Sequence, residues 1–242
     1  MSKQKKSVRR APMPAAKLTT GWVGPNKTRI RLARAEETAD INTLMERAGV
    51  RLIPALRTAI EDGTAATGIR TALERATTRA WRDSATRAFT TNRNALPSMS
   101  LPLAAVDDRG QVIGAAVVTP PASFMEQLVD LRSTQGLAYA VVLTATVAKL
   151  HGLAVADHAE GQGVGAALSD SVWKVYSALG IKILYGAFET DRNLSAFYAK
   201  CGYTVHPEGE GVSLGPIFPA SVNITPFSGE LLFSRREAGF PV

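Results

Sequence analysis

The sequence predicts a mixed α/β domain, and three observations carry that prediction. The 242 residues are 45% hydrophobic and 20% charged, which is enough apolar material to bury a sizeable core in one domain, or at most two. Residues 101–106 and 111–119 are β-rich runs joined by a turn containing glycine, as in an antiparallel hairpin. Residues 153–200 then follow the order strand, glycine-rich turn, helix, strand, helix.

The N-terminal half of the domain is predicted to hold one strand followed by helices. Residues 28–33 have strand character, and residues 34–48 carry apolar side chains at helical spacing. The pattern stays helical over 51–92 and indicates two further helices, broken near Asp62. Residues 49–98 are therefore expected to form a helical segment inside the domain.

The C-terminal half continues from the hairpin with alternating elements. The apolar run 138–156 is expected to be broken at residues 149–152, and its last residues form the strand that enters the glycine turn. The remaining elements, in chain order, are a short helix at 122–131, a helix ending at Leu179, a strand at 181–188, a short helix at 193–200, and strands at 203–205 and 230–234.

Composition and hydropathy exclude several classes of protein. The longest mostly apolar stretch, 136–148, has about 13 residues, whereas a membrane-spanning helix needs ~20. Residues 11–21 carry two prolines, a lysine and two threonines where a signal peptide would be apolar. Cys201 is the only cysteine, which excludes a disulfide framework and a multi-thiolate zinc site. These features lead us to expect a cytoplasmic protein with no membrane partner.

The net charge of +7 is concentrated near the N-terminus. Seven of the 28 Lys and Arg lie in residues 1–27, which hold no acid, so 21 basic residues are balanced by 21 acidic ones in residues 28–242. Such a segment buries too little apolar surface to offset its ordering entropy, so we expect a flexible basic tail and a domain over 28–242. The tail is either a solvated leader or an electrostatic tether to RNA, the ribosome or another polyanion.

The most informative stretch is residues 153–168 (LAVADHAEGQGVGAAL), a strand entering a glycine-rich turn that opens a helix. Backbone N–H groups at a helix start converge on one spot, and glycines allow close approach and positive φ. The helix start adds partial positive charge, so the spot suits a phosphate or pyrophosphate. A tight loop without a ligand is the alternative.

Three ligand classes compete for this turn. A nucleoside-triphosphate P-loop requires a Gly-Lys-Ser/Thr segment, and no lysine follows here. A dinucleotide fingerprint fits Gly161, Gly163 and Ala166, with Glu189 as the ribose-binding acid. Topology disfavours it, because only 53 residues follow Glu189 and an antiparallel hairpin precedes the motif. Acyl-CoA is the remaining class.

Residues 160–165 (EGQGVG) resemble the signature turn of the GNAT superfamily of acyl-CoA-dependent N-acyltransferases: Gln or Arg, two variable residues, Gly, one variable residue, then Gly or Ala. Glu160 replaces the Gln or Arg, and a carboxylate beside a pyrophosphate is repulsive by about 1 kcal/mol unless it points away or is paired. Residues 197–203 (FYAKCGY) independently resemble the family's Phe-Tyr-x-x-x-Gly-Phe/Tyr segment. The resemblance covers about residues 28–234.

The resemblance implies a GNAT-like fold whose central, mostly antiparallel sheet has splayed fourth and fifth strands. Pantetheine would pair with the freed edge like an added strand. An Asn that often contacts pantetheine is replaced by Asp191, with Asn193 as its substitute; an N-cap role for either residue is the alternative. The implied cofactor-binding residues are Leu153, Ala154, Val155, Gly161, Gln162, Gly163, Val164, Gly165, Ala166, Asn193 and Tyr198.

The resemblance also implies direct transfer of an acetyl group from acetyl-CoA to an amine without a metal ion. A backbone N–H near Val155 would stabilise the oxyanion. Tyr198 would protonate the leaving thiolate, although it could instead be a core or CoA-packing residue. Cys201 is expected to be packed, because direct transfer needs no acyl-enzyme.

The general base has two candidates. Two-residue alternation along the strand places His151 on the face of Leu153 and Val155, in line with the cofactor edge. Glu189, at the end of the next strand, is the second candidate. A half-buried structural histidine and a surface carboxylate are the respective alternatives.

The sequence thus predicts an N-acetyltransferase that acts on an unidentified primary amine, as a monomer or homodimer. The alternative is a non-catalytic acyl-CoA-binding module whose tail tethers it to nucleic acid or a partner. The acceptor can be a small amine, an amino-acid or peptide N-terminus, a protein lysine, an antibiotic or aminoacyl-tRNA.

Overall fold

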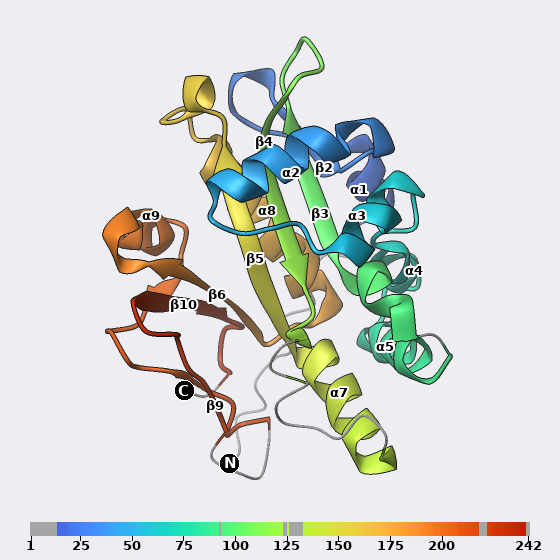
Figure 1. Cartoon of the computed structure of the whole chain (residues 1–242). Coiled ribbons are helices and arrows are strands. Elements are labelled where there is room, and N and C mark those ends of the chain that lie inside the picture. The colour runs from blue at the N-terminus through green and yellow to red at the C-terminus, as the bar shows by residue number, and fades with distance from the viewer. Residues whose placement is uncertain (1–13, 92, 123–124, 126–132, 218–221, 241–242) are drawn as a thin grey trace, which may run out of the picture.

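The chain folds around one large mixed sheet, seen in a computed structural model that describes residues 14–91, 93–122, 125, 133–217 and 222–240 (Figure 1). Its eight strands lie in the order β1-β2-β3-β4-β5-β6-β10-β7, and only β5 and β6 pair in parallel. The strands are β1 Trp22–Val23, β2 Arg29–Leu32, β3 Leu101–Val106, β4 Val112–Thr119, β5 Val147–Val155, β6 Ile183–Glu189, β7 Thr204–Val205 and β10 Glu230–Arg236, while β8 Val212–Ser213 and β9 Asn223–Ile224 form a separate pair.

Helices occupy the connections between these strands. None of the described helices is long and apolar enough to cross a membrane. The α-helices are α1 Ala16–Thr20, α2 Thr38–Arg47, α3 Pro54–Glu61, α4 Thr67–Glu74, α5 Thr78–Thr91, α7 Thr134–Thr146, α8 Val164–Leu179 and α9 Ser195–Lys200. The 3-10 helices are η1 Pro25–Lys27, η2 Ala35–Glu37, η3 Arg93–Met99, η4 Asp157–Ala159 and η5 Thr190–Arg192.

Helices cover both faces of the sheet. On one face, called here the α2 face, Ile41, Met45 and Leu56 pack against the small side chains of Ala115 and Val117 on β4. On the other, the α8 face, α8 crosses behind β3, β4 and β5, and α4 packs beside it (Figure 1). The mixed sheet and the antiparallel hairpin of β3 and β4 confirm the predicted fold class.

The parallel strands β5 and β6 part after a short paired segment. Their register runs only from Val147–Ile183 to Lys149–Tyr185. Beyond it, among the described strands, β5 pairs only with β4 and β6 only with β10. A Cβ on Gly186, the next residue of β6, would overlap the ring of Phe233 and lie 2.9 Å from the carbonyl oxygen of Leu150. Glycine at this position makes room for the Phe233 ring and for the close approach of Leu150. The two strands no longer pair beyond it, so the expected splay is confirmed.

A β-bulge in β5 corrects two expectations. Val117 pairs with Gly152 and Val118 pairs with Leu150, so His151 has no partner on β4. The strand therefore runs through residues 149–152, where a break was expected. The extra residue also reverses the alternation of side chains, which had been expected to place His151 on the face of Leu153.

The predicted tail includes part of the folded domain. Leu18 of α1 is 0% exposed and belongs to the same core cluster as Ile30. Trp22 of β1 pairs with Ile30 of β2. Residues 14–27 thus belong to the domain, which corrects the expected boundary after residue 27. The composition of this segment was misleading, because the side chains of Leu18 and Trp22 are enough to attach it to a core that later residues form. Residues 1–13 lie outside the described residues.

The helical segment is more divided than predicted. The break near Asp62 is confirmed, but α3, α4 and α5 replace the two expected helices because a second break occurs at Ala76, which has φ of 51°. The apolar run from residue 138 begins in α7, whose N-cap Ser133 accepts a hydrogen bond from Gly136. The helix expected at 122–131 lies almost wholly outside the described residues.

We predict that Leu18→Ala lowers the free energy of unfolding by roughly 2–5 kcal/mol, because it leaves a cavity in a fully buried site. Val23→Ala is the control, since Val23 is 84% exposed in the neighbouring strand and its truncation should cost less than about 0.5 kcal/mol. Urea denaturation measures both. If the Leu18→Ala protein matched the unaltered one, residues 14–27 would not contribute to the domain.

Candidate functional site

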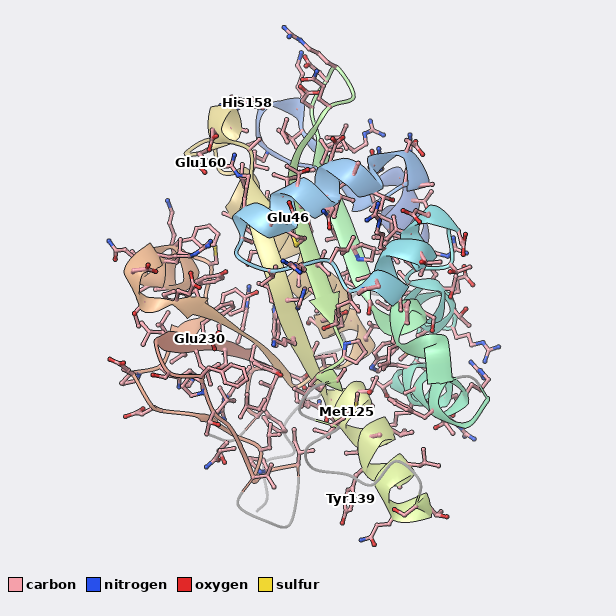
Figure 2. The ribbon with its side chains drawn as sticks, viewed as in Figure 1. Glu46, Met125, Tyr139, His158, Glu160 and Glu230 are labelled. Carbon is pink, nitrogen blue, oxygen red and sulfur yellow. The ribbon has the colours of Figure 1, made fainter. Side chains whose placement is uncertain are left out.

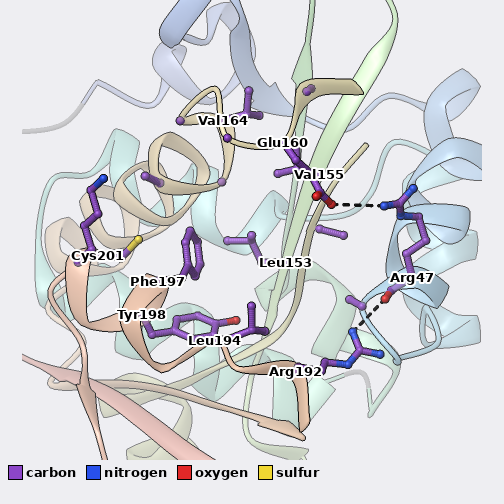
Figure 3. Close-up of a pocket in the computed structure, with 18 residues that line it drawn as sticks. Arg47, Leu153, Val155, Glu160, Val164, Arg192, Leu194, Phe197, Tyr198 and Cys201 are labelled. Carbon is purple, nitrogen blue, oxygen red and sulfur yellow. Dashed lines mark hydrogen bonds and ion pairs between the residues drawn. The ribbon is translucent and has the colours of Figure 1, made fainter. Parts of the chain in front are cut away.

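A cavity of about 460 Å³ opens where β5 and β6 part (Figure 3). One wall is the edge of β5, one is the glycine turn before α8, one is α9, and the C-terminal end of α2 closes the mouth. The turn lies at one end of the sheet, where Figure 2 labels His158 and Glu160. The residues lining the cavity are Arg47, Ala48, Leu153, Ala154, Val155, Ala159, Glu160, Gly161, Gly163, Val164, Gly165, Ala166, Arg192, Leu194, Phe197, Tyr198, Lys200 and Cys201.

The glycine turn has the geometry of an anion site. Gly161 and Gly163 have φ of 71° and 83°, a region that side-chain-bearing residues rarely adopt. Gly163 is the N-cap of α8, so the N–H groups of the first helical turn, at Val164, Gly165 and Ala166, have no acceptor within the helix. These donors and the positive end of the helix dipole converge on the cavity, where an anion would be stabilised.

The edge of β5 provides a second binding element. Leu153, Ala154 and Val155 line the cavity, and among the described strands they pair only with β4. The opposite edge of this segment presents N–H and C=O groups toward the cavity. An extended ligand containing amides can bind such an edge in the manner of an added strand.

Tyr198 is held rigidly at the cavity wall. Its ring stacks on Phe233 with a centroid distance of 3.6 Å and contacts Phe197 and Tyr203 edge-on. The residue is 6% exposed, and burial raises the pKa of its phenol well above the usual value, so the hydroxyl keeps its proton. Figure 3 shows this hydroxyl directed from α9 toward β5.

The carboxylate of Glu160 is paired with a cation that comes from α2. Its Oε1 lies 3.5 Å from Nη2 of Arg47, as Figure 3 shows. The same nitrogen donates a hydrogen bond to Asp157. The Arg47 guanidinium lowers the pKa of Asp157. Sequence reasoning missed Arg47, because it lies 113 residues before Glu160 and nothing local marks it.

Arg192 is a second cation at the cavity that the sequence did not indicate. Its Nη1 donates to the carbonyl oxygen of Arg47 over 3.0 Å, and its Nε donates to Oε2 of Glu189 over 3.1 Å. Glu189, a candidate base, is therefore engaged in an ion pair and is not among the residues that line the cavity.

His151 lies away from the residues that line the cavity. Its Nε2 donates to the carbonyl oxygen of Arg51 over 2.9 Å, on the α2 face of β5. That bond leaves the lone pair of the neutral ring on Nδ1. Burial lowers the pKa of the imidazole, which favours the neutral form.

Two of the expected cofactor-binding residues, Gln162 and Asn193, are not among the residues that line the cavity. The amide of Gln162 accepts from Asn26 over 2.9 Å and donates to the carbonyl of His158 over 2.7 Å. Asn193 adopts a left-handed conformation with φ of 48° and does not line the cavity. The N-cap of α9 is Leu194, without a side-chain hydrogen bond, so the alternative N-cap role is wrong.

Cys201 is only partly packed, because one side of it lines the cavity. Burial raises the pKa of its thiol, so the nucleophilic thiolate is disfavoured. In the part of the chain that the structure describes, no cluster of side chains could hold a metal ion.

Comparison with known proteins places this geometry in a family. The model of the acetyltransferase (GNAT) family matches residues 66–203. No curated protein sequence matches the chain significantly.

Several solved structures are similar in fold. The GNAT domain of PAT from S. lividans is 15% identical, with 87% of this chain and 90% of that chain covered and a TM-score of 0.46. A GNAT-family acetyltransferase from Staphylococcus aureus Mu50 is 10% identical, with 86% and 98% covered and a TM-score of 0.47. A phosphinothricin acetyltransferase from Sinorhizobium meliloti, solved with acetyl-CoA, is 16% identical, with 86% and 88% covered and a TM-score of 0.43. Because the family model matches more than half of the 242 residues, this chain belongs to the GNAT acetyltransferase family, whose acyl transfer uses acetyl-CoA as co-substrate.

Proposed function

We propose that this protein transfers the acetyl group of acetyl-CoA to a primary amine by direct attack in the cavity between β5, the glycine turn and α9. The observation that carries the proposal is that one cavity contains both an unpaired strand edge and the glycine turn of a helix start. The edge suits the two amides of pantetheine, and the turn suits the diphosphate. Family membership supports acyl-CoA-dependent transfer; the amine as acceptor is our proposal.

Val155 and Tyr198 would have different roles in the reaction of the thioester. Attack by the amine places negative charge on the thioester oxygen, which the backbone N–H near Val155 would stabilise. Collapse of the intermediate releases CoA thiolate, which must gain a proton. The geometry supports this role, because Tyr198 lines the cavity and its ring is fixed by stacking on Phe233.

His151 is the better of the two candidate bases. An ammonium acceptor must lose its proton before attack, and His151 offers a neutral ring with its Nδ1 lone pair available. His151 lies on the α2 face and does not line the cavity. A proton from the amine substrate would therefore reach His151 through water, or through groups of the substrate that extend outside the cavity. Glu189 is weaker in this role because its charge is already balanced by Arg192.

The non-catalytic module is the second candidate, and the observation favouring it is that Asn193 does not line the cavity. Such a module would bind CoA tightly and release no thiol. Free thiol appearing from acetyl-CoA in the presence of an amine mixture would exclude it. The basic tail is proposed to influence location or acceptor choice and to take no part in chemistry.

We predict that the protein binds acetyl-CoA and CoA but not NAD, and that Gly163→Glu abolishes CoA binding by filling the turn with a strained, anionic side chain. Calorimetry measures all three ligands. Gly110→Glu is a matched control, since Gly110 has the same φ of 83° but lies in the β3–β4 turn with open space around it. Binding of NAD in place of CoA would contradict the proposal.

Tyr198→Phe is expected to lower kcat by roughly 100-fold, the usual scale for a general acid, and to leave the Kd for CoA nearly unchanged. Tyr203→Phe is the control, because Tyr203 belongs to the same aromatic cluster but its hydroxyl contacts Ser169. Steady-state kinetics and calorimetry give the two quantities. An unchanged kcat for Tyr198→Phe would remove this residue from the mechanism.

The pH profile separates the two bases. The pKa of His151 lies below its ordinary 6.5, so the neutral base is present above that pKa and is lost as pH falls through it. We expect kcat/KM to fall with decreasing pH below about 6.5, and this acidic limb to disappear in His151→Gln but remain in Glu189→Gln. The reverse pattern would assign the base to Glu189.

A further inference from the structure

We propose that Arg47 is a positioning residue that neutralises Glu160 and thereby allows the glycine turn to bind the diphosphate of CoA. The inference rests on the proposed function of this cavity. It concerns a residue of α2, outside both sequence segments that resemble the family, and it explains how a carboxylate is tolerated at the start of the turn.

A free carboxylate at position 160 would interfere with an anion site in two ways. It would repel the diphosphate, and it could itself accept hydrogen bonds from the unpaired N–H groups at the start of α8. Asp157 lies in the same loop and adds a second negative charge. Without a compensating cation, the negative charge of this loop would therefore weaken binding of the CoA diphosphate at the glycine turn.

Arg47 supplies that cation from a fixed position. It is the last residue of α2, where the negative end of the helix dipole favours a cation, and its carbonyl oxygen is held by Arg192. A single guanidinium carries five N–H donors, so it can hold Asp157 and Glu160 together. Figure 3 shows the Glu160 side chain extending toward Arg47 and away from Val164 at the start of α8.

The pairing makes a specific prediction about coupling. If Arg47 acts by neutralising Glu160 and Asp157, its loss should matter only while these two residues are carboxylates. If Arg47 instead binds phosphate directly, its loss should weaken CoA equally whatever occupies positions 157 and 160. A double-mutant cycle distinguishes the two cases.

The experiment measures the Kd for CoA by calorimetry in the unaltered protein, in Arg47→Gln, in Asp157→Asn combined with Glu160→Gln, and in the variant that carries all three changes. We expect Arg47→Gln to weaken CoA by about five- to tenfold in the unaltered background, and by less than about twofold where both carboxylates are removed. Arg47→Lys, which keeps the charge, should bind CoA nearly as tightly as the unaltered protein. Arg57→Gln is the control, since Arg57 forms an exposed ion pair with Glu61 outside the cavity.

Pantetheine, which lacks phosphate, separates this role from a loss of cavity shape. Its affinity should be the same in all these proteins, and thermal melting shows whether each variant is folded. Equal weakening of CoA in both backgrounds, or none in either, would overturn the role of Arg47 while leaving the proposed function intact. Failure of the unaltered protein to bind CoA would overturn the proposed function itself, and this inference with it.

Discussion

The separation of β5 from β6 is the constraint on which the rest of the site depends. It begins at Gly186, where any side chain would collide with the ring of Phe233. The same ring stacks on Tyr198 and fixes it at the cavity wall. One aromatic side chain on β10 therefore fills the space beside Gly186, where the pairing of the two strands ends, and stacks on the phenol proposed as general acid.

The cavity also balances opposing charges at its mouth. The start of α8 gathers positive potential, while the preceding loop carries the carboxylates of Asp157 and Glu160. Arg47 connects these carboxylates to α2 across the edge of β5. Arg47 thus links α2, on one face of the sheet, to the loop that precedes α8 on the other face. A change in the packing of α2 would therefore alter the charge at the turn where a phosphate would bind.

Local patterns predicted the elements whose signal lies within a short window. The hairpin, the glycine turn, α8 and the segment containing Tyr198 were readable because their turn residues, periodicity and motif spacing are contiguous. The cavity brings most of the expected cofactor residues together, including Leu153 and Gly163.

The remaining features depend on distant parts of the chain. The bulge at His151 arises from the register with β4, so strict alternation misplaced the side chain. The docking of Leu18 depends on a core contributed by later residues. The uniformly apolar run that begins in α7 gave no periodicity to separate helix from strand. Arg47 could be found only by placing α2 beside the loop before α8.

The unpaired edge of β5 also has a consequence for the solubility and stability of the protein. In the described structure, Leu150 to Val155 offer one row of backbone donors and acceptors that no strand covers. A ligand that binds only the folded state stabilises it in proportion to the logarithm of its concentration, and an open edge is also where another chain can add and start aggregation. Occupancy by acyl-CoA would therefore protect the protein from self-association, and its solubility and lifetime would follow the supply of its own co-substrate.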